Sequence, residues 1–340
     1  MNKDKLIQIA KRLSDPPKGI LAADESTKTI KKRFESIDLN STFETRRKYR
    51  EILFKTENLN KFISGIILYD ETIRQTTSEG DLFPKYLIKN GISPGIKVDT
   101  GAISLSNSKE KVTEGIDGLG ERLKEYKSLG AEFTKWRAII QIDSSIPTDY
   151  CIELNSDLLG RYARIVQDND LVPIVEPEIL MDGEHSIEEC YEVTKKTLKK
   201  VFEQSEKHNV FLKGMLLKPN MIISGKSCKK QASVEEVSKM TVNCLKETVP
   251  DDVPGIVFLS GGQSNQLATN HLNEMNKSFK KLPWNLSFSY GRALQQPSIS
   301  SWMGKDKNTE VSQKALFLRS KLNSNATLGN YSGEQENLSR

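Results

Sequence analysis

Residues 211–221 of the chain, FLKGMLLKPNM, form an apolar run that stops at a lysine and a proline. Such runs are typical of buried strands, and a proline does not continue a strand inside a sheet. We therefore expect a strand over residues 211–217 that carries Lys218 at its end. An amine held partly away from water can lose its proton near neutral pH and attack a carbonyl group. The alternative is that Lys218 extends into solvent, as most lysines at strand ends do.

Seven further apolar or β-branched runs recur along the 340 residues, with helical patterns between them. The eight expected strands cover residues 19–23, 62–69, 95–99, 133–140, 171–175, 211–217, 256–259 and 286–290. Their near-continuous hydrophobicity indicates strands that are covered on both faces, as in a parallel sheet. Two of the intervening segments begin with the capping-box pattern of a helix, at Ser186 and Ser233.

Eight alternations of strand and helix favour an α/β fold with a single (β/α)8 barrel and an active site at the carboxyl ends of the strands. An open doubly wound sheet is the alternative, but no glycine fingerprint for a dinucleotide follows the first strand. We assign residues 1–322 to the barrel domain. Residues 323–340 are polar and poor in large apolar residues, so we expect a mobile carboxyl-terminal tail.

The composition is that of a soluble globular protein, with 36% hydrophobic residues, 28% charged residues and a net charge of only +5. The densest basic cluster, at residues 195–200, lies among glutamates on a helical pattern, which predicts a solvated helix face and no binding of nucleic acid. No apolar run is long enough to span a membrane, and residues 1–14 lack the apolar core of a signal peptide. The four cysteines are far apart, which favours a reduced, cytoplasmic location.

Charged or hydrogen-bonding residues end seven of the eight strands, and a barrel gathers such strand ends in one region. Desolvation of many charges is costly unless they pair with one another and with a ligand. Lys135, if it lies close to Lys218, would favour the uncharged, nucleophilic form of that amine. The alternative is that Lys135 and Arg137 form buried pairs with Asp24 or Glu176.

Two glycine turns near the end of the chain predict a phosphate site. Gly261-Gly262 lets the backbone approach a ligand closely, just before a helix that presents free amide groups. Gly291-Arg292 adds a permissive turn and a guanidinium group. A metal site is not expected, because His185, His208 and His271 are isolated and no HExxH motif occurs.

Seven motifs in this chain resemble those of the class I fructose-bisphosphate aldolases. They are LAADES (21–26), GIKVD (95–99), KWR (135–137), VPIVEPEIL (172–180), LLKPNM (216–221), FLSGGQS (258–264) and FSYGRALQ (288–295). The resemblance implies reversible cleavage of fructose 1,6-bisphosphate to dihydroxyacetone phosphate and glyceraldehyde 3-phosphate. A lysine iminium, acting as the electron sink, would replace a metal or other cofactor.

The resemblance also assigns roles to residues. Lys218 would form the Schiff base, Glu176 would act as the acid and base in carbinolamine dehydration, and Asp24 would take the hydroxyl proton during carbon–carbon cleavage. Lys135 would stabilise charge near the cleaved bond. Glu178 would position Lys218 and Glu176.

The remaining implied contacts are with substrate. Ser260, Gly261 and Arg292 would hold the phosphate on the ketose side, and Ser26, Lys97 and Arg137 would approach the other phosphate. Further substrate contacts are expected at Gly262, Ser289 and Gly291. The implied partner is a sugar bisphosphate, and the implied assembly is a homotetramer.

One departure from the family concerns the carboxyl terminus, where relatives usually carry a longer tail that ends in tyrosine. Tyr331 does not match that terminal position, so we expect protonation of the enamine to be slowed or transferred to another group. Two alternatives to the aldolase stay open: a sugar-phosphate-binding protein without efficient catalysis, and a Schiff-base lyase for a different ketose phosphate.

Overall fold

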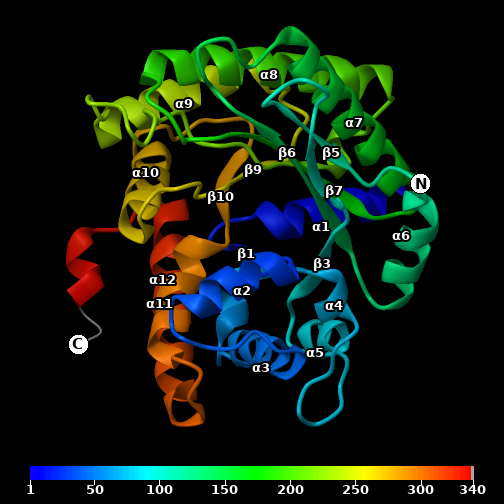
Figure 1. Cartoon of the computed structure of the whole chain (residues 1–340), viewed down its shortest axis with the longest axis vertical. Coiled ribbons are helices and arrows are strands. Elements are labelled where there is room, and N and C mark those ends of the chain that lie inside the picture. The colour runs from blue at the N-terminus through cyan, green and yellow to red at the C-terminus, as the bar shows by residue number, and fades with distance from the viewer. Residues whose placement is uncertain (338–340) are drawn as a thin grey trace.

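Eight parallel strands close into a barrel in the computed structural model, which describes residues 1–337 (Figure 1). Around the barrel the strands follow one another in the order β1-β10-β9-β8-β7-β6-β3-β2. They are β1 (Gly19–Ala22), β2 (Ile63–Leu68), β3 (Ser93–Lys97), β6 (Phe133–Ile140), β7 (Val172–Ile179), β8 (Leu216–Leu217), β9 (Gly255–Phe258) and β10 (Asn285–Tyr290). The predicted (β/α)8 barrel is confirmed.

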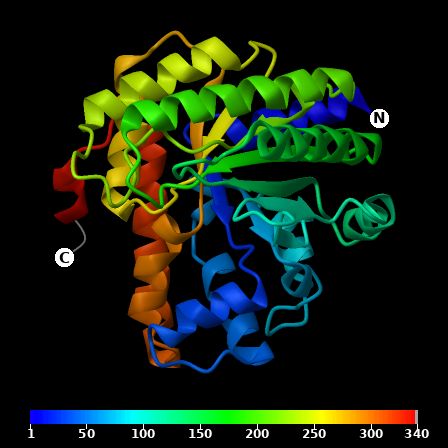
Figure 2. The same cartoon turned by 45° about the horizontal axis from the view of Figure 1, so that its top comes forward.

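Helices surround the strands (Figures 1 and 2). They are α1 (Lys3–Ser14), α2 (Thr27–Glu35), α3 (Phe43–Phe54), α4 (Asp70–Ile73), α5 (Phe83–Lys89), α6 (Leu119–Ser128), α7 (Asp149–Asp168), α8 (Ile187–Lys207), α9 (Val234–Thr248), α10 (Asn265–Ser278), α11 (Arg292–Trp302) and α12 (Thr309–Thr327). The two predicted capping boxes are confirmed, since the hydroxyls of Ser186 and Ser233 accept hydrogen bonds from the first turns of α8 and α9. None of the helices within residues 1–337 is long and apolar enough to cross a membrane.

Helix α1 packs against the inside of the barrel. Its residues Leu6, Ile9 and Leu13 belong to one buried apolar cluster with inward-facing strand residues such as Phe133 and Val257. A larger cluster fills the space between the outside of the barrel and the helices. Helix α1 covers the amino ends of the strands, and the charged groups lie at the opposite, carboxyl ends.

The strand predicted over residues 211–217 is much shorter in the structure. Only Leu216–Leu217 pairs with its neighbours, and a 3-10 turn covers Leu212–Gly214. A Cβ atom on Gly214 would lie 2.8 Å from the Cβ of Leu6, so helix α1 packs directly against this turn. Residues 214–217 are buried as expected, whereas Phe211 and Leu212 are only partly buried and do not pair in the sheet.

An antiparallel hairpin, β4 (Gly101–Ser104) with β5 (Lys111–Glu114), was not predicted. It follows β3 and lies outside the barrel sheet. The Thr113 hydroxyl donates to the carbonyl of Arg137 at 2.8 Å, which joins the hairpin to β6. Since much of this hairpin is polar and partly exposed, it lacks the apolar pattern by which the barrel strands were identified.

The expected domain boundary at residue 322 falls inside α12. Asn323 is fully buried and accepts a hydrogen bond from the Thr269 hydroxyl at 3.0 Å. Beyond the helix, the backbone amide of Tyr331 donates to Asn273 at 2.9 Å. The mobility of the tail stays a prediction, and its last part, residues 338–340, lies outside the described residues.

Candidate active site

A cavity of about 390 Å³ lies at the carboxyl ends of the barrel strands. Thirteen of the fourteen site residues predicted from the sequence line it, and only Gly262 does not. The thirteen are Asp24, Ser26, Lys97, Lys135, Arg137, Glu176, Glu178, Lys218, Ser260, Gly261, Ser289, Gly291 and Arg292. The barrel therefore brings together residues that lie up to 268 positions apart in the chain.

Lys218 lies at the end of β8 and is buried, with 3% of its surface exposed. Its backbone amide donates to the carbonyl of Val175 at 2.8 Å, which is the last ladder bond before Pro219. Its Nζ lies 3.1 Å from Oε1 of Glu176, which is equally buried. The amine is thus held inside the cavity beside a carboxylate that can take or return its proton.

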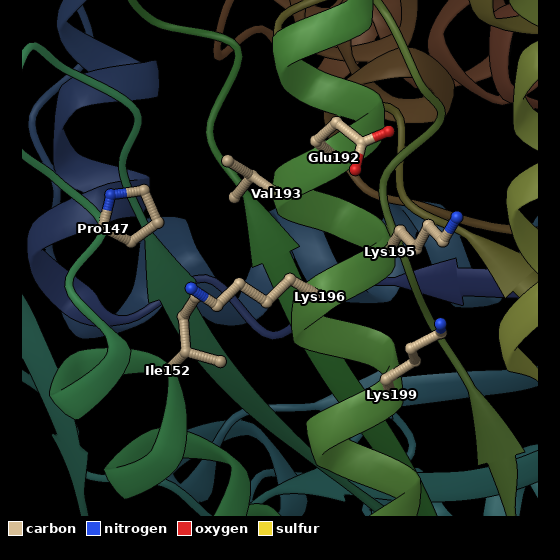
Figure 3. Close-up of a pocket in the computed structure, with 7 residues that line it drawn as sticks. All are labelled: Pro147, Ile152, Glu192, Val193, Lys195, Lys196 and Lys199. Atoms are coloured by element: carbon tan, nitrogen blue, oxygen red, sulfur yellow. The ribbon is translucent and has the colours of Figure 1, made fainter.

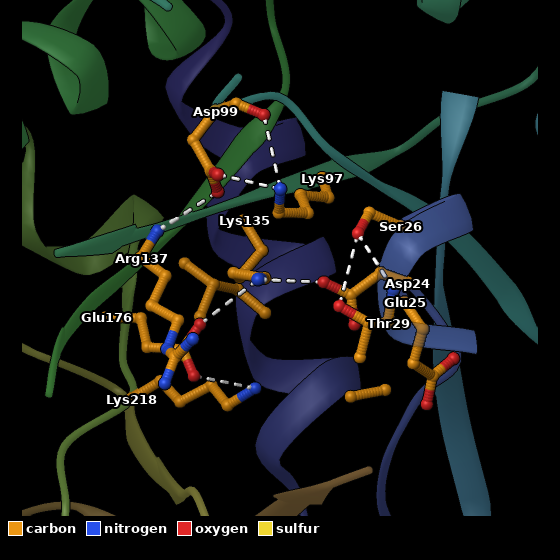
Figure 4. Close-up of polar contacts among 12 residues, drawn as sticks. Asp24, Glu25, Ser26, Thr29, Lys97, Asp99, Lys135, Arg137, Glu176 and Lys218 are labelled. Carbon is orange, nitrogen blue, oxygen red and sulfur yellow. Dashed lines mark hydrogen bonds and ion pairs between the residues drawn. The ribbon is translucent and has the colours of Figure 1, made fainter. Parts of the chain in front are cut away.

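Lys135 bridges two carboxylates (Figure 4). Its Nζ lies 2.7 Å from Oδ2 of Asp24 and 3.3 Å from Oε2 of Glu176. Burial disfavours the charged form of Lys135, but the nearby carboxylates outweigh it and raise its pKa. This ammonium group therefore stays charged between the two acids.

Both carboxylates are held in their ionised forms. Burial raises the pKa of Asp24, but the positive charges of Lys135 and Lys218 outweigh burial and keep this pKa well below its ordinary value. For Glu176, burial is again the largest single effect and raises the pKa. The combined positive charges of Lys218, Lys135 and Arg137 outweigh burial and lower the pKa. Asp24 is thus available as a proton acceptor.

The other two basic groups on this side also have acidic partners. Lys97 Nζ lies 2.8 Å from Oδ1 of Asp99, and Arg137 pairs through Nε with Glu178. The alternative that Arg137 pairs with Asp24 or Glu176 is wrong, whereas the same alternative is correct for Lys135. Glu178 thus contacts Arg137, and its role in positioning Lys218 and Glu176 stays a prediction.

The ends of β9 and β10 provide the groups expected for a phosphate. Arg292 Nη2 donates to the carbonyl of Gly261 at 3.0 Å, so the two glycine turns lie together. Gly261 has a φ of 53°, which is the left-handed conformation that glycine adopts readily. Helix α11 begins at Arg292, and the buried Ser289 hydroxyl has no hydrogen-bond partner among residues 1–337. Free amides, a hydroxyl and a guanidinium group suit a phosphate.

Gly262 differs from the other predicted residues because it does not line the cavity. A Cβ atom there would lie 2.1 Å from Sδ of Met181, so this glycine allows the loop to pack closely against the segment after β7. The predicted substrate contact of Gly262 stays a prediction.

A buried charge cluster next to Asp24 was not predicted. Glu25 pairs with Arg33 at 2.6 Å and Arg50 at 2.8 Å, and it accepts a hydrogen bond from Gln295 at 2.7 Å. Glu25 and Arg33 both line the cavity. Arg33 follows Ser26 by seven residues, which is two turns of α2, so both lie on the same face of the helix. This spacing is the signal from which a position of Arg33 near the cavity was predictable.

Tyr331 does not line the cavity. Its hydroxyl donates to Oε1 of Glu336 at 2.9 Å, and burial with this contact raises its pKa to about 12. It is therefore a packing residue of the segment after α12, which fits the expectation that it does not correspond to the terminal tyrosine of the family.

A second cavity, of about 420 Å³, lies beside α8 and shares no residue with the first (Figure 3). Its lining residues are Pro147, Ile152, Glu192, Val193, Lys195, Lys196 and Lys199. Lys195 pairs with Glu247 and Lys196 with Asp149. The basic cluster lies on a helix as predicted, and these two lysines are paired with acidic groups of the neighbouring helices. Residues 1–337 contain no group of three His, Cys, Asp or Glu side chains suited to a metal ion.

Comparisons with known proteins place the chain in a family. The family model described as "Glycolytic: Fructose-bisphosphate aldolase class-I" matches residues 5–340. A probable fructose-bisphosphate aldolase class 1 of Xanthomonas campestris is 52% identical over 98% of this chain and 100% of that protein. The cytosolic fructose-bisphosphate aldolase 4 of Arabidopsis thaliana is 48% identical over 97% of this chain and 84% of its own length. The fructose-bisphosphate aldolase of Plasmodium falciparum, solved in complex with TRAP and a small-molecule inhibitor, superimposes with a TM-score of 0.96 at 48% identity, covering 97% of this chain and 96% of that chain.

Proposed function

Since the chain belongs to the class I fructose-bisphosphate aldolase family, we propose that Lys218 is the amine that condenses with the ketone of the sugar. The reaction itself is that of the family: reversible cleavage of fructose 1,6-bisphosphate to dihydroxyacetone phosphate and glyceraldehyde 3-phosphate through a lysine Schiff base. The assignment of roles to residues of this chain is the proposal.

The contact of 3.1 Å between Lys218 Nζ and Glu176 Oε1 carries this proposal. Transfer of one proton across that contact gives a neutral amine and a neutral carboxylic acid. The amine attacks the ketone carbon and forms a carbinolamine. Glu176 then protonates the leaving hydroxyl, water departs, and the iminium remains on Lys218.

Carbon–carbon cleavage is assigned to Asp24. Its carboxylate is ionised, as the lowered pKa indicates. It takes the proton of the hydroxyl group on one of the two carbons joined by the bond that breaks. That carbon becomes the aldehyde, and the electron pair of the broken bond moves into the iminium to give an enamine. Lys135, between Asp24 and Glu176, stabilises negative charge as it develops.

The two phosphates are assigned to opposite sides of the cavity. Ser260, Gly261 and Arg292 hold the ketose-side phosphate, with Ser289, Gly291 and the loop shaped by Gly262 in support. Lys97 and Arg137, together with Ser26 at the start of α2, approach the other phosphate. The ion pairs of Lys97 with Asp99 and of Arg137 with Glu178 hold both cations on the side of the cavity assigned to this second phosphate before substrate binds. Two anchors on opposite sides place the bond to be broken between Lys218 and Asp24.

Borohydride trapping tests the central assignment. Dihydroxyacetone phosphate and borohydride should leave a reduced adduct on the peptide that contains Lys218, and a chelator should leave turnover unchanged. Lys218→Arg should abolish the adduct, whereas Lys213→Arg, a change at an exposed lysine of the same segment, should retain it. An adduct on a different lysine of the native chain would contradict the proposal.

We extend the proposal to assembly on the family resemblance, to location on the widely spaced cysteines, and to the tail on its polar composition. The chain is a homotetramer, acts in the cytoplasm and carries a mobile tail after the barrel domain. Light scattering of the purified protein tests the first statement, fractionation of cells the second, and amide hydrogen exchange in the tail the third. A monomer at micromolar concentration would contradict the tetramer.

A further inference from the structure

Strand β8 is too short to pair with the whole length of β7. Their ladder ends at Val175 and Leu217, although β7 continues to Ile179. The backbone of β7 that faces β8 beyond this point belongs to residues 177 and 179, because alternate residues of a strand point to the same side. Glu176 and Glu178 lie in this part, which stays paired with β6 through Ile179 but has no ladder bond to β8, the strand that leads into Lys218.

A proline contributes to this gap in the ladder. Pro177, whose backbone faces β8, has no N–H to donate, whereas the backbone of Pro219 faces β9 and accepts a hydrogen bond from the Leu259 amide at 3.1 Å. The N–H of Ile179, which is 3% exposed, would be left buried without a partner in the ladder. An unpaired buried amide is strongly disfavoured, so another acceptor is required at this position.

The side chain of Asn220 supplies that acceptor. Its Oδ1 receives the hydrogen bond of the Ile179 amide at 3.0 Å, so a side chain replaces the missing ladder bond. Its Nδ2 donates to the Thr194 hydroxyl on α8 at 3.2 Å and to the carbonyl of Met221 at 3.1 Å. Asn220 is itself 5% exposed and does not line the cavity.

We propose that Asn220 is a positioning residue that fixes the Glu176–Glu178 segment of β7 relative to Lys218. Two hydrogen bonds flank the two glutamates on β7. The Lys218 amide donates to the Val175 carbonyl before them, and the Ile179 amide donates to Asn220 after them. The peptide unit held by Asn220 is the one that follows Glu178, which orients Arg137. The inference rests on the proposed roles of Lys218 and Glu176, since its effect is exerted through their 3.1 Å contact.

Three variants test this role. Asn220→Ala removes the acceptor and both donors. Asn220→Asp keeps an oxygen opposite the Ile179 amide and removes the donors. Asn323→Ala is the matched control, because Asn323 is a fully buried asparagine on α12 whose side chain also joins two elements, through Thr269.

Asn220→Ala should lower kcat for fructose 1,6-bisphosphate at least tenfold, because displacements of the order of 1 Å among reacting groups cost up to about 100-fold in rate. KM should change less than threefold, since the phosphate contacts lie elsewhere. The rate of borohydride trapping at Lys218 should fall with kcat. Asn220→Asp should return kcat to within about threefold of the native value. Asn323→Ala should lower the melting temperature but leave kcat within twofold.

Three results would overturn the inference: a kcat of Asn220→Ala within twofold of native, an equal loss of kcat in the Asn323→Ala control, or an Asn220→Asp variant as slow as a folded Asn220→Ala. If Asn220→Ala does not fold, the Asn220→Asp variant decides, and a kcat reduced more than tenfold contradicts the role of the retained oxygen. Failure of the native chain to trap at Lys218 would instead refute the proposed function, so the two failures are distinguishable.

Discussion

Lys135 and Asp24 form an ion pair of 2.7 Å that crosses the mouth of the barrel. Lys135 lies on β6 and Asp24 follows β1, and β2 and β3 separate these strands in the sheet. The same ammonium group lies 3.3 Å from Glu176 on β7. One cation thus connects the acid assigned to dehydration with the base assigned to cleavage, and the pKa of both carboxylates depends on it.

Replacing Lys135 with methionine should lower kcat by about 100-fold or more, the range found when a charge-stabilising group is removed from an active site. The pKa of Asp24 and Glu176 should rise, because the positive charge that lowers both is lost. The acid limb of the kcat profile should therefore move to higher pH. Lys196→Met, at a lysine on α8 outside the cavity, is the control. An unmoved acid limb in Lys135→Met would contradict this prediction.

The two guanidinium groups should differ in the substrates that they affect. Arg137→Ala should raise KM for fructose 1,6-bisphosphate by about 10-fold to 100-fold, as expected for loss of a hydrogen bond to a charged group, and should change KM for fructose 1-phosphate little. Arg292→Ala should raise KM for both substrates, because both carry the ketose-side phosphate. Steady-state kinetics of the two variants with the two sugars measure this, and an equal effect of Arg137→Ala on both sugars would show that the phosphate assignments are wrong.

Gly261→Ala should weaken the ketose-side phosphate site. A Cβ atom at a φ of 53° is strained by about 1–2 kcal/mol, and the loop relieves this strain by moving away from Arg292. KM for both sugars should rise while Schiff-base trapping at saturating substrate is retained. Gly80→Ala provides the comparison, since Gly80 also has a positive φ, with no atom within 4 Å of its added Cβ. It should destabilise the fold similarly without changing KM.

His271 should make the folded chain less stable in acid. Burial lowers its pKa from 6.5 to about 4, and its Nδ1 lies 2.6 Å from Oε1 of Gln263. Between these two pH values the unfolded state binds more protons than the folded state, so the free energy of unfolding falls as the pH falls through this interval. The loss in the free energy of unfolding reaches about 3 kcal/mol at the acidic end of this pH interval. In His271→Asn, which keeps a donor near the position of Nδ1, urea unfolding at pH 6.5 and pH 4.5 should show a smaller difference than in the native chain.

The sequence determined the class of fold and most of the site because both depend on local patterns. Eight apolar runs with helical segments between them predict a barrel, and the residue at the end of a run lies at the end of a strand in any barrel. For this reason Lys218, Glu176 and Asp24 were placed together without coordinates. The motifs then added roles that spacing alone does not provide.

The tertiary structure decided which charged groups pair and where a side chain takes the place of a missing hydrogen bond in the sheet. Lys135 pairs with Asp24 and Glu176, whereas Arg137, two residues later, pairs with Glu178. The missing ladder bond of Ile179 is made by a side chain 41 positions away. Such contacts depend on distances between segments that are remote in the chain, and these distances are set only when the barrel closes and its interior packs.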